Sequence, residues 1–261
     1  MAAHSASLAK ILRQGSQDAA GTGVVIGPRQ VLTCAHVVYD ALGRDGLDPS
    51  VPEGEIRITL PLRLGGGADF EMKLRADGWV PPMAEPEFGI AEDLALLELV
   101  GTADFPAGVL PPRFTDMDLG NALDRPVAMS GFPGGNSFDT VLGATRGLDD
   151  RSRLQIDPAN SERVVAGGFS GAAVLDLKTG CLIGLLVSKK TRDNVTIAYA
   201  IPVGTIAKAV DLSAVMVPTP GEARLPPLPR NFVSREAFLA PLREKVLSGI
   251  TAGVRQARLL G

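Results

Sequence analysis

The sequence predicts an all-β fold. From Gly21 onward, short runs of aliphatic and β-branched residues alternate with turn-forming Gly, Pro, Asp and Asn. The 30 glycines and 20 prolines among 261 residues favour many turns over long helices. No recurring helical segments separate the runs, so a parallel α/β sheet is not expected. A barrel or sandwich of short strands fits this pattern best.

The hydrophobic pattern locates individual strands. Residues Ile56–Leu60 alternate apolar and polar side chains, which is typical of a strand with one buried face. Residues Leu94–Leu99 form a nearly continuous apolar run, which indicates a strand buried on both faces. The same reasoning gives further expected strands at Val24–Ile26, Val31–Thr33, Pro126–Met129, Ala173–Leu175, Leu182–Ser188 and Thr196–Ile201.

Some regions are expected to lie outside the strands. Residues Asp40–Glu55 are rich in Gly, Asp and Pro, which predicts an exposed loop. Residues Gly204–Val210 are a candidate short helix, and the five prolines of Val217–Asn231 are typical of an extended linker. Beyond them, apolar residues recur at three- and four-residue spacing, which predicts an amphipathic helix that begins near Ala240.

Composition argues against several classes of protein. A net charge of −3 offers no basic footprint for nucleic acid. No run approaches the roughly 20 apolar residues of a membrane span, and the N-terminus lacks the apolar core of a signal peptide. We therefore expect a cytoplasmic protein without nucleic-acid or membrane partners.

The few cysteines and histidines argue against a disulfide framework and a metal site. The two cysteines, Cys34 and Cys181, are expected to be buried free thiols, with one bridge between them as the alternative. The two histidines and two cysteines match no metal-ligand spacing, so we expect no metal and no other cofactor.

Three reactive side chains lie at the edges of apolar runs. His36 ends the segment Thr33–His36, Asp93 precedes an apolar run, and Ser170 lies between glycines in Gly167–Ala172. A serine hydroxyl needs a base within hydrogen-bond reach, and that base needs a third group to orient it. The pattern therefore predicts Ser170 as nucleophile, His36 as general base and Asp93 as the orienting carboxylate.

The glycine before the nucleophile suggests an oxyanion hole. A tetrahedral intermediate needs backbone N–H donors that point at its oxyanion. Glycine permits the backbone to turn two N–H groups inward, because it has no Cβ to clash. We expect the N–H groups of Gly168 and Ser170 to be these donors.

The motifs resemble those of the trypsin-like (chymotrypsin-fold) serine peptidases, and especially the bacterial members. Gly21–Gly23 with Thr33–His36 resembles the strand pair that leads to the family's Thr-Ala-Ala-His motif. Asp93–Leu97 resembles Asp-(Ile/Leu)-Ala-Leu-Leu, and Gly168–Gly171 resembles Gly-(Asp/Asn)-Ser-Gly. The resemblance covers about Ser7–Val210. It implies two packed six-stranded antiparallel β-barrels with the triad in the cleft between them, here followed by a C-terminal helical extension.

The resemblance also implies a division of the chain. We expect a peptidase domain at residues 1–214, with barrels at 1–112 and 113–214. A proline-rich linker at 215–231 and an amphipathic helix at 232–261 would follow. The helix is expected either to pack on the peptidase body or to dock a regulatory protein partner.

One departure from the family pattern bears on regulation. Phe169 replaces the Asp or Asn that usually precedes the nucleophile. In secreted relatives that Asp binds the new N-terminus after zymogen cleavage, so this chain cannot use that switch. The resemblance then implies either constitutive assembly or regulation by other means.

Substrate contacts are implied by the resemblance alone. The substrate main chain would pair with the strand that includes Ser188, Lys189 and Lys190, and Ser188 would lie behind Asp93 and orient it. The base of the P1 pocket falls near Val164. A carboxylate is lacking there, so a small or apolar P1 residue is expected, with an acidic one as the alternative.

The sequence thus predicts a serine endopeptidase that cleaves protein or peptide substrates through an acyl-enzyme on Ser170. The alternative is a dormant or inactive protease-like module that acts by partner binding, within a bacterial stress or defence signalling system.

Overall fold

The structure is a computed structural model that describes residues 5–44, 50–61, 67–83, 92–119, 122–133, 137–159, 168–192 and 195–219. Val164, most of the expected linker and the expected C-terminal helix at 232–261 lie outside the described residues. None of the described helices is long and apolar enough to cross a membrane.

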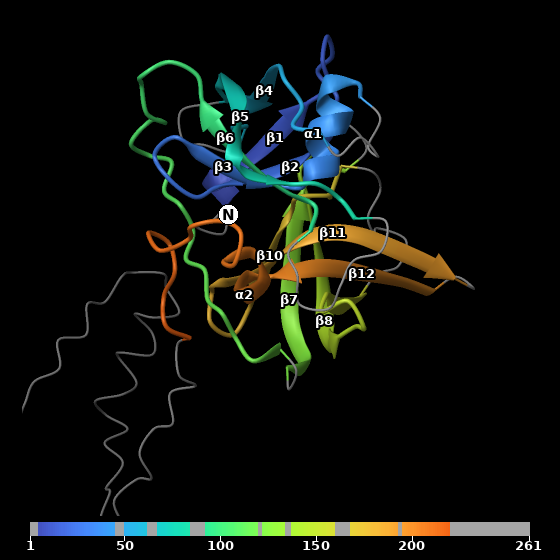
Figure 1. Cartoon of the computed structure of the whole chain (residues 1–261). Coiled ribbons are helices and arrows are strands. Elements are labelled where there is room, and N and C mark those ends of the chain that lie inside the picture. Colours follow the sequence, from blue (N-terminus) through green and yellow to red (C-terminus); the bar gives the residue numbers. More distant parts are fainter. Residues whose placement is uncertain are drawn as a thin grey trace, which may run out of the picture. The chain divides into compact units, whose positions relative to one another are not determined.

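The first six strands form a closed barrel in the order β1-β2-β3-β6-β5-β4 (Figure 1). Every neighbouring pair is antiparallel. A short 3-10 helix, Ser5–Ser7, precedes the barrel, and helix α1 (Ala35–Leu42) follows β3. The strands are β1 (Leu8–Leu12), β2 (Ala19–Val25), β3 (Gln30–Thr33), β4 (Glu55–Thr59), β5 (Asp69–Val80) and β6 (Leu94–Leu99).

The other six strands form a second closed antiparallel barrel in the order β10-β11-β12-β9-β8-β7. A short helix, α2 (Val203–Ile206), follows the last strand. The expected fold of two six-stranded antiparallel barrels is therefore confirmed. The strands are β7 (Leu123–Gly131), β8 (Asp139–Leu148), β9 (Leu154–Pro158), β10 (Ala173–Asp176), β11 (Leu182–Arg192) and β12 (Val195–Pro202).

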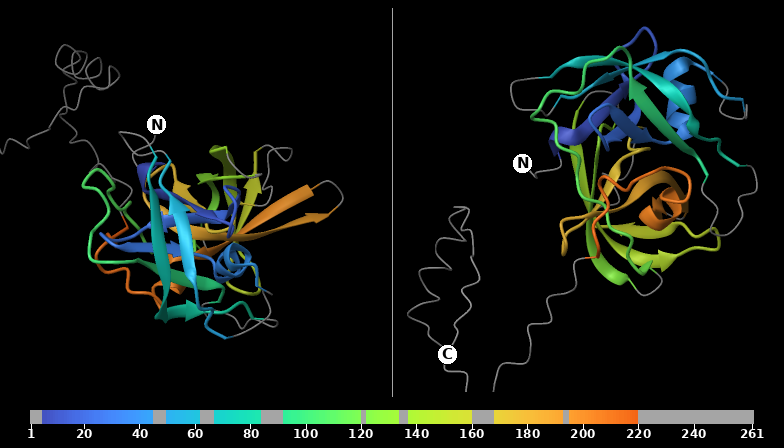
Figure 2. Two further views of the ribbon diagram at one scale, coloured as in Figure 1. Left: turned by 90° about the horizontal axis from the view of Figure 1, so that it is seen from above. Right: turned by 60° about the vertical axis from the view of Figure 1, so that its left-hand side comes forward.

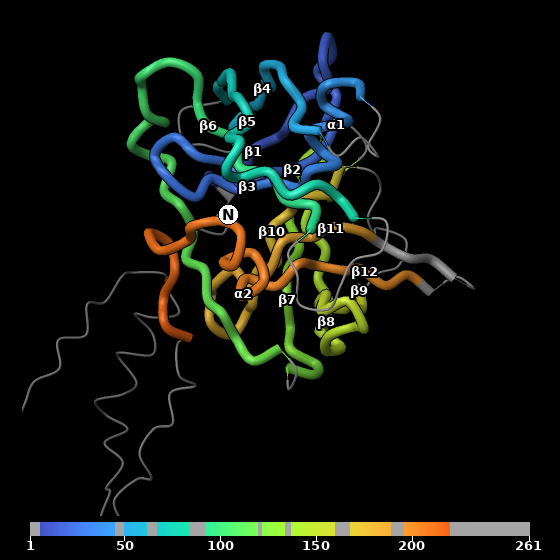
Figure 3. Tube along the Cα trace, in the orientation of Figure 1, coloured from blue at the N-terminus to red at the C-terminus, as the bar shows by residue number. Residues whose placement is uncertain are grey.

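The segment between the barrels is held by the last described residues. Its trace is green in Figure 3, and the final orange stretch returns to it. The Phe114 N–H donates to the Val215 carbonyl at 2.9 Å, and the Val217 N–H donates to the Phe114 carbonyl at 2.8 Å. The first residues that we assigned to the linker therefore pair with the body of the protein.

The β11–β12 hairpin extends beyond the second barrel (Figure 2). Strand β10 pairs with β11 only as far as Leu185. Further on, Ser188–Arg192 pair with β12 and, within the described residues, with no other strand. This leaves one edge of β11 available beside the hairpin.

Apolar side chains fill both barrels. Strands β1 and β2 are buried along their whole lengths. A separate cluster fills the second barrel and includes Met129, Phe169 and Leu186. Cys34 and Cys181 are both free and buried, which confirms the cysteine prediction.

Differences from the expected elements have local causes. The predicted bounds of the loop at Asp40–Glu55 were wrong at both ends, because Asp40 belongs to α1 and Glu55 begins β4. Gly43 ends α1 in a left-handed conformation, with φ of 64°. Strands β5 and β8 were missed because exposed and half-buried positions interrupt their apolar pattern. Helix α2 ends at Ile206, so the helix expected at Gly204–Val210 is shorter.

A buried ion pair ties β7 to the β10–β11 turn. The Arg125 guanidinium donates to both carboxylate oxygens of Asp176, at 2.6 and 2.8 Å. Asp176 is fully buried and also accepts the Thr179 N–H at 2.9 Å. Burial alone would raise the pKa of Asp176, but the hydrogen bonds from Arg125 and Thr179 outweigh it and lower that pKa.

We predict that Asp176→Asn lowers the free energy of unfolding by about 3–5 kcal/mol at neutral pH, because Arg125 loses its buried carboxylate partner. A lowered folded-state pKa gives a contribution that is complete above the unfolded-state pKa and is lost as pH falls through the folded-state pKa. Urea denaturation at several pH values measures both effects.

Asp157→Asn is the matched control, since the Asp157–Arg146 pair is about half exposed and its contribution to stability is expected to be much smaller. Equal loss of stability in the two variants would contradict the prediction.

Candidate active site

The Asp93 carboxylate makes two hydrogen bonds to His36. Its Oδ1 accepts the backbone N–H of His36 at 2.8 Å, and its Oδ2 lies 2.6 Å from Nδ1 of the ring. Asp93 is only 6% exposed. An ionised carboxylate can only accept, so Nδ1 carries a proton, and Nε2 has the lone pair in the neutral tautomer that this contact favours. The arrangement leaves Nε2 able to act as a base.

Local backbone geometry directs both residues. His36 lies in the first turn of α1, directly after β3. Asp93 has a left-handed backbone with φ of 54°, which Asp tolerates better than most residues. Its N–H donates to the Pro81 carbonyl at 3.3 Å. Asp93 therefore turns its side chain toward α1 immediately before β6 begins.

Ser170 lies in a tight turn that two glycines make possible. The Ala172 N–H donates to the Phe169 carbonyl at 2.8 Å and closes the turn. Gly168 and Gly171 have φ values of 107° and 80°, which favour glycine. A Cβ on Gly171 would lie 1.9 Å from the Thr22 carbonyl oxygen, so no other residue fits there without moving β2.

Thr22 joins the first barrel to this turn. Its hydroxyl donates to the Gly168 carbonyl at 2.8 Å and accepts the Phe132 N–H at 3.2 Å. Its backbone N–H donates to the Ser170 carbonyl at 2.8 Å. Thr33 then donates its hydroxyl to the Thr22 carbonyl at 2.7 Å. Thr22 is fully buried, so these bonds are shielded from water.

The expected oxyanion donors have no competing partners. Within the described residues, neither the Gly168 N–H nor the Ser170 N–H donates a hydrogen bond. Both groups therefore remain available to a ligand oxygen. Gly167 lies outside the described residues.

Phe169 anchors the same turn from the other side. Its side chain is fully buried in the core of the second barrel. A Cβ on Gly131 would lie 3.0 Å from the Phe169 ring, which shows how closely β7 packs against it. An apolar contact thus holds this position.

The nucleophile turn lies close to the helix that carries His36. A Cβ on Gly21 would meet both the Val37 side chain at 2.6 Å and the Ser170 carbonyl oxygen at 2.9 Å. Among the described residues, no hydrogen bond joins the Ser170 hydroxyl to His36. Such bonds are often long in the absence of substrate.

The expected substrate-contacting residues are only partly described. Lys189 and Lys190 lie on β11 and pair with Ala198 and Ile197 of β12. Ser188 is half-buried, and its expected position behind Asp93 stays a prediction, with no hydrogen bond between the two side chains among the described residues. Ser188 faces a neighbouring cavity.

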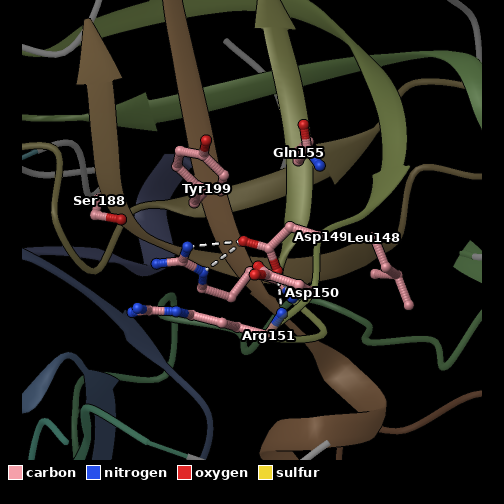
Figure 4. Close-up of a pocket in the computed structure, with 8 residues that line it drawn as sticks. Leu148, Asp149, Asp150, Arg151, Gln155, Ser188 and Tyr199 are labelled. Carbon is pink, nitrogen blue, oxygen red and sulfur yellow. Dashed lines mark hydrogen bonds and ion pairs between the residues drawn. The ribbon is translucent and has the colours of Figure 1, made fainter. Parts of the chain in front are cut away.

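That cavity has a volume of about 730 Å³ and a polar lining (Figure 4). Ser188, Gln155 and Tyr199 come from three adjacent strands. Arg153 lies over the Tyr199 ring at 4.5 Å and donates to Asp149 at 2.7 Å.

Two arginines that line the cavity, Arg151 and Arg153, lie within electrostatic reach of Glu92, the residue before Asp93. Burial raises the pKa of Glu92, and the charges of Arg153 and Arg151 oppose that rise.

Sequence reasoning missed Thr22 and the cavity residues. A threonine between two glycines carries no chemical signature until its partners at Gly168 and Phe132 are known. Arg153 and Tyr199 are far apart in the chain and become neighbours only through the pairing of β9 with β12.

Solved structures of other proteins share the fold of this chain. The Rv3671c protease of M. tuberculosis, in an inactive form, matches with a TM-score of 0.53 and 21% identity over 82% of this chain and 91% of that one. The MamO protease domain from Magnetospirillum magneticum matches with a TM-score of 0.54 and 16% identity, over 80% and 97%. Human heparin binding protein matches with 0.58 and 14%, over 80% and 90%.

Sequence comparison gives the family. A search of curated protein sequences finds no match. The family model of the trypsin-like peptidase domain matches residues 21–185, which include the segments that carry His36, Asp93 and Ser170. This chain belongs to the trypsin-like peptidase family.

Proposed function

We propose that the protein is a serine endopeptidase in which Ser170 is the nucleophile, His36 the general base and Asp93 the group that orients the base. The double hydrogen bond from His36 to Asp93 carries the proposal, because it favours the neutral tautomer of His36 in which Nε2 can accept a proton. The trypsin-like peptidase family supports the reaction class.

The reaction follows from these groups. Ser170 Oγ attacks the substrate carbonyl while His36 Nε2 takes the hydroxyl proton. Asp93 stabilises the imidazolium, and the N–H groups of Gly168 and Ser170 bind the oxyanion. His36 then donates the proton to the leaving amine, which gives the acyl-enzyme. Water, activated by the same ring, releases the acyl group and restores Ser170.

The substrate is proposed to be a protein or peptide that lies along the available edge of β11. Ser188 and the polar cavity beside it would contact residues on the acyl side of the cleaved bond. We propose a small or apolar P1 residue, because the base of the expected P1 pocket falls near Val164. Lys189 and Lys190 are the basis of the acidic alternative. Profiling the cleavage of a denatured proteome decides between them.

One observation favours the second candidate, a dormant module that acts by binding a partner. Ser170 and His36 share no hydrogen bond within the described residues. In this alternative, a regulatory partner, bound through the C-terminal residues, would bring the two side chains together.

We predict that a fluorophosphonate probe labels the wild type on Ser170, because the probe requires an activated serine. Ser170→Ala should abolish labelling, and Asp93→Asn should slow it by roughly 10⁴-fold, since an amide favours the wrong tautomer of His36. Intact-mass spectrometry measures the adduct.

Ser213→Ala, which changes an exposed turn serine, is the matched control and should label like the wild type. The proposal of an active peptidase fails if no adduct dependent on Ser170 forms, even with candidate partners added.

We further predict that Thr22→Val slows labelling by roughly ten- to a hundredfold, less than the loss of an oxyanion donor, which costs about 10²–10³-fold. Valine keeps the shape but leaves the Gly168 carbonyl and the Phe132 N–H without their buried partner. Thr22→Ser keeps the hydroxyl and should restore most of the rate. Equal labelling rates for the valine and serine variants would show that the hydroxyl does not position the turn.

A further inference from the structure

Cys34 brings a third donor atom to the His36–Asp93 pair. The cysteine sulfur, a ring nitrogen of His36 and a carboxylate oxygen of Asp93 all lie within 4.8 Å of one another. Cys34 is fully buried, and its thiol donates to the Leu186 carbonyl at 3.4 Å. Sulfur, nitrogen and oxygen donors in one cluster are the ligand set that proteins use for zinc.

We propose that Cys34, His36 and Asp93 form an inhibitory binding site for a thiophilic divalent cation such as Zn²⁺. The ion would bind Nδ1 of His36, Oδ2 of Asp93 and the Cys34 thiolate, and the His36 ring proton would move from Nδ1 to Nε2. Its inhibitory effect rests on the proposed function, whereas the binding itself does not.

The distances fit this ion after small movements. Tetrahedral zinc with ordinary bond lengths holds its N, O and S donors about 3.4–3.7 Å apart. The Nδ1–Oδ2 pair, now 2.6 Å apart, must therefore open by about 1 Å, and the sulfur, which lies within 4.8 Å of both atoms, needs to move by about 1 Å at most. The His36 side chain is 35% exposed, so one member of the cluster reaches solvent.

Charge balance favours the ion over the thiol proton. Burial and the Asp93 charge raise the pKa of Cys34, and the backbone of Gly171 lowers it. A divalent cation neutralises one thiolate and one carboxylate, so with a neutral imidazole the occupied site carries no net charge in its buried surroundings. Binding releases about one proton, from Cys34, so affinity should rise with pH.

The ligand set also selects the cation. Thiolate and imidazole favour zinc and its soft or borderline relatives, whereas Mg²⁺ and Ca²⁺ prefer oxygen ligands. A metal on Nδ1 withdraws electron density from the ring and removes the Asp93 contact that stabilises the imidazolium. His36 could then no longer accept the Ser170 proton.

The spacing of the three ligands in the sequence does not predict this cluster. Cys34 and His36 are two residues apart, but Asp93 follows His36 by 57 residues and joins them only through the fold. The expectation of no metal considered histidines and cysteines alone. A carboxylate completes the set.

Direct binding is tested with Co²⁺, whose complex with a thiolate has a charge-transfer band in the near ultraviolet. The probe is added to full-length Ser170→Ala, which cannot form an adduct, and proton release is followed in weak buffer. We expect the band, with about one proton released per metal. Cys34→Ala should lose the band, whereas Cys181→Ala, which removes the other buried thiol, should keep it.

Inhibition is tested by fluorophosphonate labelling with added Zn²⁺, each variant being compared with its own metal-free rate. Zn²⁺ should block wild-type labelling, and Mg²⁺ at the same concentration should not. Cys34→Ala should need at least about tenfold more Zn²⁺, since loss of even an outer partner of a metal site costs that much. Cys34→Ser serves as a second variant of nearly native volume and should also lose sensitivity.

The outcomes separate the two proposals. A cobalt band without any labelling of the wild type would support the metal site and overturn the peptidase activity. Labelling without a thiolate band, or equal zinc sensitivity in wild type and Cys34→Ala, would overturn the metal site and leave the peptidase proposal standing.

Discussion

The candidate site depends on one carboxylate held between two donors of the same residue. Asp93 binds the backbone N–H and the ring Nδ1 of His36, so it fixes the position, ring orientation and tautomer of the base together. Its left-handed backbone is sustained by the buried β6 that follows. Every chemical step assigned to His36, and its proposed capture by a metal, follows from this contact.

A second constraint joins the base to the nucleophile. His36 belongs to the first barrel and Ser170 to the second, so the reaction needs a defined junction between them. Thr22 supplies it with hydrogen bonds to Gly168, Ser170 and Phe132, all from the second barrel. Phe169 holds the same turn by apolar packing in the core of the second barrel. This contact does not depend on a new N-terminus. The turn is therefore held by groups that are present as soon as the chain folds.

Sequence reasoning reached the fold for a physical reason, and the same signals mark the proposed reactive residues. Continuous apolar runs such as β6 and glycine-flanked turns leave local signals, and His36, Asp93 and Ser170 lie at the ends of such segments. The junction through Thr22 leaves no local signal, because it depends on partners more than one hundred residues away. Strand β5 was missed for a different reason. Its many exposed and half-buried positions interrupt the alternation of apolar and polar residues that indicates a strand.

The most direct measurement is nuclear magnetic resonance of the His36 ring with isotope-labelled histidine. The sequence has only two histidines, so a His4→Ala variant leaves a single signal to interpret. The account predicts a far-downfield proton on Nδ1, a neutral ring that is the Nδ1–H tautomer, and loss of the downfield proton in Asp93→Asn. A neutral ring protonated on Nε2, or a downfield proton that survives in Asp93→Asn, would contradict it.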